Sequence, residues 1–285
     1  MLVVGLVAAA LAALLAAPAA ARADGIMLIQ AGPFWMGRDD GPPDEAPLHR
    51  VFVRDVWLER HKVTNAEFAA FLNARGLRST EGERRYDHDD ADARIHAVAV
   101  RGAGAGPMMI WKADVGYERH PAVEVSWFGA RDYCAFKGRR LPTEAEWEKA
   151  ARGDDRRLYP WGAAPPAPHL AVFGRAYNAT EPTASRPDGA SPHGVHDMLG
   201  NLREWTLSVL RPYPYRTDGD REPYTGATGR VVVRGASHDD PADSLALTRR
   251  RSYDRRGASA GHHFVGFRCA TSEDLGEVAP GGRSP

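Results

Sequence analysis

The sequence is organised around residues 194–206, which read GVHDMLGNLREWT. Two carboxylates in this stretch, Asp197 and Glu204, flank a glycine, Gly200. The glycine favours a turn and the polarity is high for a core strand, so the stretch is predicted to be a folded loop. Its oxygens could converge on a hard cation such as calcium, or its carboxylates could accept hydrogen bonds from backbone NH groups around the turn. Spacing alone favours the second alternative.

The composition indicates one large domain or two small ones, rich in turns. Of 285 residues, 29 are glycine and 21 are proline, so short elements joined by long loops are expected. Lys and Arg (37) balance Asp and Glu (37). A balanced chain has no overall field to attract nucleic acid or an acidic membrane, so neither is expected as a partner.

Residues 1–23 are typical of a secretory leader. The apolar run LVVGLVAAALAALLAA is broken by Pro18, and the A-R-A at 21–23 offers a cleavage site before Asp24. No Lys or Arg precedes the run, so retention as an anchor is the alternative to cleavage. Cleavage predicts an exported protein, periplasmic or secreted. No stable membrane insertion is expected afterwards, because no later stretch is long and apolar enough to span a bilayer.

Three helices are predicted from their N-terminal caps. Thr64 with Glu67, and Thr143 with Glu146, match the T-x-x-E capping box, and Ser126 is placed to cap a helix between them. Strands are expected at 26–37, 50–63, 122–125, 231–234 and 264–270. The acidic run DHDD at 87–90 could suggest a metal site, but a charge run between arginines is more typical of a solvated loop.

Seven segments together resemble the formylglycine-generating-enzyme family, also called the sulfatase-modifying-factor family. They are GPFWMG (32–37), KVTNAEFAAF (62–71), VSWFGARDYCAFKGRRLPTEAEWEKAARG (125–153), YPWG (159–162), GVHDMLGNLREWT (194–206), VVVRGAS (231–237) and VGFRCA (265–270). The resemblance implies a single irregular, turn-rich α+β domain of the C-type-lectin-related kind. That domain would occupy residues 24–285, with a core over about 26–272.

The resemblance also implies a structural disulfide and a calcium site. Cys134 and Cys269, the two cysteines of the chain, lie in segments where the family carries its disulfide, and an exported protein favours the bond. The bond closes a long loop and would stabilise by about 4–5 kcal/mol in the chain-entropy model; two buried free thiols are the alternative. One calcium ion is expected on Asp197, Glu204 and the carbonyls of two further residues. Those two are Gly200 and Leu202.

The copper site that the family uses to oxidise a substrate cysteine is not expected here. By the resemblance its two thiolates fall on positions 240 and 245, which are Asp240 and Leu245. Thiolates are the ligands that select copper(I), so copper is not expected and formylglycine generation is disfavoured. Iron is compatible with histidines and carboxylates but lacks further support.

A polar cleft is expected around residues 238–263. Its members are the candidate catalytic residues Ser237, His238 and Asp240, with Asp239, His262 and His263 beside them. The resemblance favours an exported oxidative-maturation or accessory factor acting on a peptide or protein, similar to the branch that matures the siderophore pyoverdine. The substrate would then be a peptide, a protein or a siderophore-like peptide. The alternative is a non-catalytic module that binds a ligand or protein in the cleft, so enzyme activity stays open.

Overall fold

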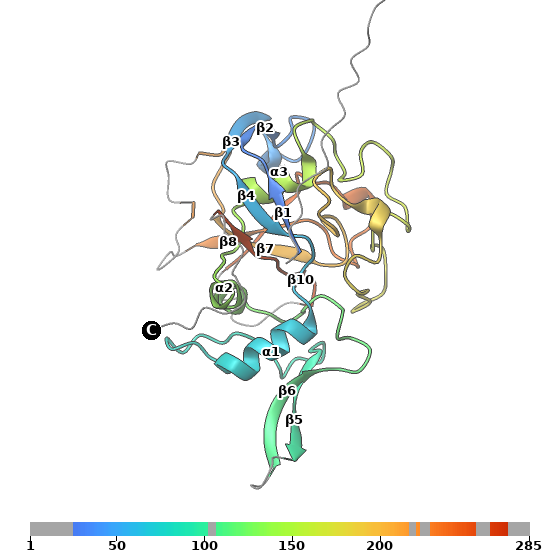
Figure 1. Ribbon diagram of the computed structural model, residues 1–285. Coiled ribbons are helices and arrows are strands. Elements are labelled where there is room, and N and C mark those ends of the chain that lie inside the picture. Colours follow the sequence, from blue (N-terminus) through green and yellow to red (C-terminus); the bar gives the residue numbers. More distant parts are fainter. Residues whose placement is uncertain (1–24, 102–106, 217–220, 223–228, 255–262, 273–285) are drawn as a thin grey trace, which may run out of the picture.

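The computed structural model describes residues 25–101, 107–216, 221–222, 229–254 and 263–272. The predicted leader and the tail from Glu273 lie outside these residues. The architecture is a mixed one with few helices, small sheets and much irregular chain (Figure 1). The α-helices are α1 (Asn65–Arg75), α2 (Trp127–Phe136) and α3 (Glu144–Arg152). The 3-10 turns are Pro43–Glu45, Pro187–Gly189 and Ala242–Ser244.

All three helices begin at the predicted caps. The Thr64 and Thr143 side chains each accept from a backbone NH at the third helical residue, and the glutamates there complete both capping boxes. Ser126 Oγ accepts from the backbone NH of Gly129 at 3.0 Å. Side-chain oxygens thus satisfy NH groups that the first turn leaves without helical partners. Helix α3 ends at Gly153 with φ 74°, a left-handed conformation that glycine adopts without strain.

Two sheets form the centre of the molecule, and two hairpins flank them (Figure 1). The first sheet has the order β1-β4-β11, with β1 (Ile26–Ile29), β4 (Val56–Glu59) and β11 (Ala270–Thr271). The second has the order β10-β7-β8-β9, with β10 (Val265–Gly266), β7 (Arg203–Val209), β8 (Arg230–Arg234) and β9 (Arg250–Asp254). The hairpins pair β2 (Gly32–Met36) with β3 (His49–Val53), and β5 (Ile95–Arg101) with β6 (Pro107–Ala113).

Several predicted strands differ in extent. The predicted strands 26–37 and 50–63 are each broken, giving β1 and β2 and then β3 and β4. Residues 122–125 form no strand and contribute only an isolated bridge between Val125 and Tyr86. The segment 264–270 pairs only at its ends, in β10 and β11. Short pairings separated by turns replace the long strands, because each strand end belongs to a different sheet.

The loop prediction for 194–206 is wrong for its last four residues. Residues from Arg203 onward form β7, whose side chains are all buried. High polarity argued against a core strand, but a buried charge is tolerated where opposite charges and hydrogen bonds surround it. Distant parts of the chain provide those partners, as described below.

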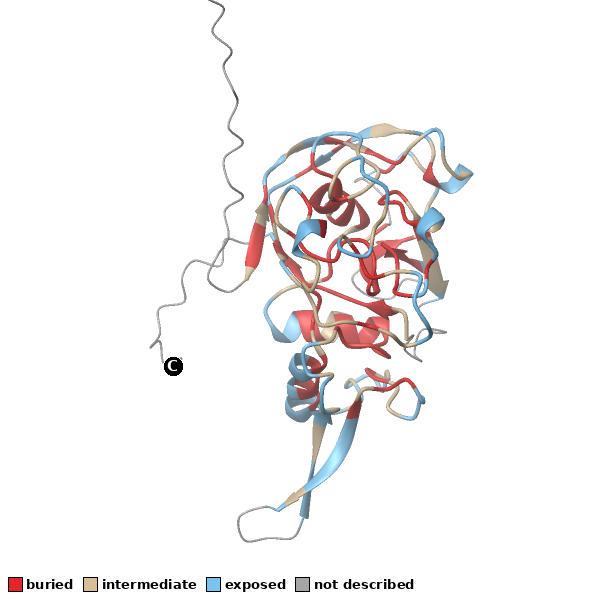
Figure 2. Ribbon diagram, turned by 90° about the vertical axis from the view of Figure 1, so that its right-hand side faces the viewer, coloured by how far each residue is buried: buried red, intermediate tan, exposed pale blue. Residues whose placement is uncertain are grey.

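The core consists of two apolar clusters around fully buried tryptophans. Trp127 and Trp205 belong to one cluster and Trp147 to the other. Figure 2 shows the buried residues concentrated in the upper body, while the β5–β6 hairpin projects from it with mostly exposed residues. Among the described residues, no helix is both long and apolar enough to cross a membrane.

Candidate functional site

Strand β7 carries Glu204 into the core between two buried cations. Arg268 donates to both carboxylate oxygens of Glu204, at 2.7 and 2.8 Å, and Lys62 Nζ lies 3.0 Å from Oε1. Burial alone would raise the pKa of Glu204, but Arg268 and Lys62 outweigh burial and lower it. We call Lys62, Glu204 and Arg268 the paired cluster, because each charge in it faces an opposite one.

Lys62 occupies the position between Asp197 and Glu204 where the calcium ion was expected. The Lys62 ammonium, itself buried, donates to the backbone oxygen of Asp197 and contacts the Glu204 carboxylate. A divalent ion added there would meet the ammonium and the neighbouring guanidinium in a water-poor environment, where like charges repel strongly. Calcium on Asp197, Gly200, Leu202 and Glu204 therefore stays a prediction, and Lys62 is the competing cation.

Cys134 and Cys269 form the expected disulfide, with Sγ atoms 2.05 Å apart. It links α2 to the segment between β10 and β11, and no free cysteine is present. Of the two positions that the resemblance assigns to copper thiolates, Leu245 is buried in the apolar core and Asp240 is buried in an ion pair. No thiolate is therefore available to hold copper(I).

The candidate catalytic residues form a tight turn after β8. Ser237 donates through its backbone NH to Asp240 Oδ2 at 2.9 Å, and its hydroxyl hydrogen-bonds Asp239 and Asp240. Arg203 donates to both Asp240 oxygens at 2.7 and 3.1 Å, and Arg251 donates at 2.7 Å. Burial would raise the pKa of Asp240, but the Arg203 hydrogen bonds and charge lower it. Asp240 is thus an ionised carboxylate, both of whose oxygens accept hydrogen bonds.

His238 differs from its neighbours because one ring nitrogen is free. Its Nδ1 lies 3.1 Å from the backbone oxygen of Asn201, which can only accept, so Nδ1 carries the proton. Nε2 is buried and has no hydrogen-bond partner among the described residues. Burial lowers the pKa of His238, which favours the neutral ring. The Ser237 hydroxyl points to carboxylates, so these two side chains do not form a nucleophile–base pair.

The predicted cleft residue His263 belongs to a group that the sequence did not predict. Its ring lies 6.4 Å from that of His238 and neighbours Asp92 and Glu124. Single ligand atoms of His263, Asp92 and Glu124 all lie within 4.8 Å of one another. We call these three residues the unpaired cluster after Glu124, whose Oε2 has no hydrogen-bond partner among the described residues. Within it His263 Nδ1 lies 3.7 Å from Asp92 Oδ2. His262, the other predicted histidine, lies outside the described residues.

The charge pattern of residues 87–90 suggested a solvated loop, and this prediction holds for only part of the run. Asp89 is exposed as expected and pairs with Arg84, but Asp87 and Asp90 approach Glu124, again with ligand atoms within 4.8 Å. The backbone oxygen of Glu124 accepts from the NH of Asp87 at 2.9 Å and ties the two segments together. The sequence offered one signal for this contact, the acidic run itself, but nothing that paired it with Glu124.

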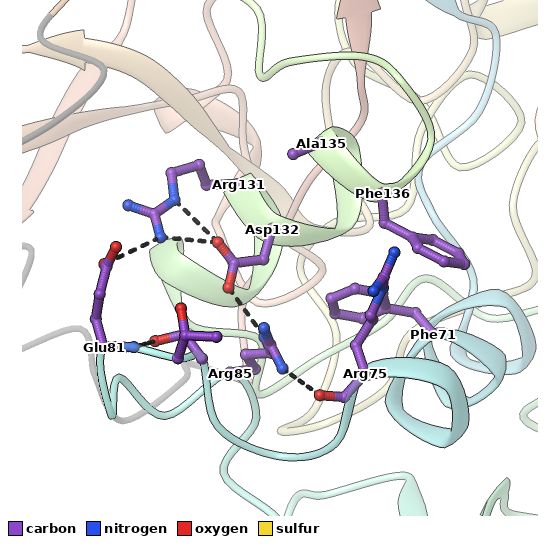
Figure 3. Close-up of a pocket in the computed structure, with 10 residues that line it drawn as sticks. Phe71, Arg75, Glu81, Arg85, Arg131, Asp132, Ala135 and Phe136 are labelled. Atoms are coloured by element: carbon purple, nitrogen blue, oxygen red, sulfur yellow. Dashed lines mark hydrogen bonds and ion pairs between the residues drawn. The ribbon is translucent and has the colours of Figure 1, made fainter.

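Figure 3 shows a separate pocket between α1, α2 and the loop that joins α1 to β5. Its charges satisfy one another: Arg85 donates to Asp132 at 2.9 Å and Arg131 donates to it at 2.8 Å. Arg75 stacks on Phe136, with its guanidinium carbon 5.1 Å from the ring centre. None of the predicted site residues lines this pocket, so the unpaired cluster and the turn at 237–240 remain the candidate site.

The fold and its disulfide-linked core define a turn-rich α+β domain whose polar turn follows a central strand. The chain matches the family model described as Sulfatase-modifying factor enzyme 1-like domain over residues 12–273 and belongs to that family.

Curated relatives support the assignment to this family. The chain is 34% identical over 294 residues to the formylglycine-generating enzyme of Streptomyces coelicolor, covering 88% of this chain and 90% of that protein. It is 35% identical over 278 residues to the hercynine oxygenase of Mycolicibacterium thermoresistibile, covering 87% and 59%. It is 33% identical over 251 residues to serine/threonine-protein kinase pkn1 of Chlamydia caviae, covering 86% and 37%. The chain thus spans less than two thirds of the last two proteins.

Solved structures with the same fold are more distant in sequence. PvdO from Pseudomonas aeruginosa superposes with a TM-score of 0.64 at 24% identity, covering 86% of this chain and 93% of that one. Treponema denticola variable protein 1 gives a TM-score of 0.58 at 18% identity, covering 86% and 94%. At these identities the likeness concerns the fold alone.

Proposed function

We propose that this chain is an exported oxidative-maturation or accessory factor that acts on a peptide, a protein or a siderophore-like peptide without a thiolate copper site. One observation carries the proposal: both cysteines are joined in the disulfide, while the position expected for a copper thiolate holds Asp240 between two arginines. Relatives named as a formylglycine-generating enzyme and a hercynine oxygenase support an oxidative activity. The histidine and carboxylates at this turn are harder ligands than sulfur, so they suit a harder metal ion than copper(I).

Two experiments test the proposal. In the first, a peptide with the sequence Cys-x-Pro-x-Arg is incubated aerobically with the protein, with and without copper, and its mass is measured. No thiol-to-aldehyde conversion is expected, and conversion by the wild-type chain would contradict the proposal. In the second, exported peptides of a strain with the gene are compared with those of a deletion strain. At least one peptide should carry an oxidative mass change only when the gene is present.

The alternative function is a binding module that uses residues 238–263 to hold a ligand without reacting. The observation that favours it is the saturation of Asp240 by Arg203 and Arg251, since a fully paired carboxylate is poorly suited to exchange protons. An exported fraction that is identical in mass with and without the gene would favour this alternative. In that case the partner should be recovered by its affinity for the purified chain.

A further inference from the structure

We propose that Asp92, Glu124 and His263 bind a divalent first-row transition-metal ion such as Mn²⁺ or Fe²⁺. The proposal stands on the unpaired cluster itself and does not depend on the oxidative function proposed above. It concerns a place different from the copper and calcium positions that the resemblance implies, because none of its three residues is among those ligands.

The three side chains converge from separate parts of the chain. Asp92 precedes β5, Glu124 precedes α2 and His263 precedes β10. One oxygen or nitrogen atom from each lies within 4.8 Å of the others, close enough for one ion to reach all three after small side-chain movements. Two carboxylates and one imidazole are a donor set for borderline divalent ions such as Mn²⁺ and Fe²⁺.

The burial of Glu124 is the observation that points to a ligand. Glu124 is 2% exposed, and its Oε2 has no hydrogen-bond partner among the described residues. Three acidic residues, Asp87, Asp90 and Asp92, each place a carboxylate oxygen within 4.8 Å of a Glu124 oxygen. A buried carboxylate among like charges is costly unless a proton or a cation compensates it. The structure therefore holds Glu124 where an added cation would be stabilising.

Neighbouring groups hold the ligands in place. The Tyr177 hydroxyl donates a hydrogen bond to Asp92 Oδ2, and the Asn178 amide donates one to Oδ1 at 2.9 Å. The His263 ring packs between Tyr177 and Phe264, at centroid distances of 4.4 and 4.5 Å. Such supporting contacts are typical around metal ligands, because they fix the orientation of each donor. The His263 side chain is 19% exposed, so the cluster is reachable from solvent.

The test measures Mn²⁺ binding by the loss of the EPR signal of the free ion. The wild-type chain should bind one equivalent, and Glu124→Gln should weaken binding by at least about tenfold. Asp92→Asn should weaken it similarly. Asp89→Asn is the matched control, because Asp89 lies in the same acidic segment but is exposed and pairs with Arg84; its affinity should equal that of the wild type.

A loss of Mn²⁺ binding in Glu124→Gln can be distinguished from a loss of folding. Glu124→Gln replaces a buried titratable carboxyl by a neutral amide of the same shape, so the variant should fold at least as well in chelator, which a melting curve checks. Absence of Mn²⁺ binding by the wild type would overturn the proposal. Binding that is weakened less than about tenfold in both Glu124→Gln and Asp92→Asn would also overturn it, because the ion would then lie elsewhere.

Discussion

The paired and unpaired clusters solve the same physical problem in opposite ways. In the paired cluster, Glu204 is buried but accepts two hydrogen bonds from Arg268 and faces the Lys62 ammonium. In the unpaired cluster, Glu124 is equally buried, and the charged groups that act on its pKa are all acidic. The pKa of Glu204 is lowered while that of Glu124 is raised.

This difference separates structural charges from functional ones. A buried charge whose partners all come from the chain itself contributes to a unique fold and has little capacity for a ligand. A buried charge that the chain leaves without a compensating group is a strained feature, and such features concentrate at functional sites. By this criterion Glu204, in the segment that dominates the sequence, is an architectural charge, and the less conspicuous Glu124 is the candidate ligand.

The largest effect is expected from Glu204→Gln. The variant leaves Lys62 and Arg268 buried without their shared carboxylate, so the free energy of unfolding should fall by about 3–5 kcal/mol. Urea denaturation measures the loss. The control is Asp155→Asn, which breaks an exposed pair with Arg157 and should cost less than about 1 kcal/mol. Equal losses in the two variants would erase the distinction between buried and exposed pairs.

A smaller effect is expected from Lys62→Met, since Arg268 still holds Glu204 in this variant. Loss of the ammonium should cost about 1.5–3 kcal/mol, the range for a hydrogen bond to a charged group. The vacated position between Asp197 and Glu204 should then accept calcium, so calcium should raise the melting temperature of the variant but not that of the wild type. A wild-type melting temperature that rises with calcium would contradict this expectation and support the calcium site predicted from the resemblance.

The smallest effect concerns the pH dependence of stability near the paired cluster. Burial, with the nearby charge of Arg268, lowers the pKa of His61 from 6.5 to about 4. The unfolded chain therefore takes up a proton that the folded chain refuses, and His61 contributes stability above pH 6.5 that is lost as the pH falls toward about 4. His61→Gln should flatten this decline in urea titrations across that range. An unchanged slope would contradict the lowered pKa of His61.

Local features of the fold could be predicted from the sequence, and compensated charges could not. The caps at Thr64, Ser126 and Thr143 depend on residues three positions apart, so the helix starts were readable. Strand β7 was missed because its polarity is balanced by Lys62 and Arg268, which lie far from Glu204 in the chain. A charge can be buried only where partners of opposite charge lie beside it, and only the tertiary structure brings such distant residues together.

The same limit applies to the candidate site. His238 and His263 were predicted to share a cleft, and their rings lie 6.4 Å apart. Asp92 and Glu124 were not predicted to join them, because an acidic residue in a charged segment and a single glutamate within a predicted strand carry no local signal of convergence. Asp92 and Glu124 come together where the loop before β5 folds against the segment before α2.

The most direct test of the distinction between the clusters compares Glu124→Gln with Glu204→Gln in chelator. Both changes replace a buried carboxylate by an amide of the same shape. Glu204→Gln should lower the free energy of unfolding. Glu124→Gln should raise it by about 1–3 kcal/mol at neutral pH, because a carboxyl with a pKa of about 8 must take up a proton on folding and an amide need not. Urea denaturation of the two variants beside the wild type gives both values. Opposite signs are the predicted result, and a loss of stability in both variants would contradict the account.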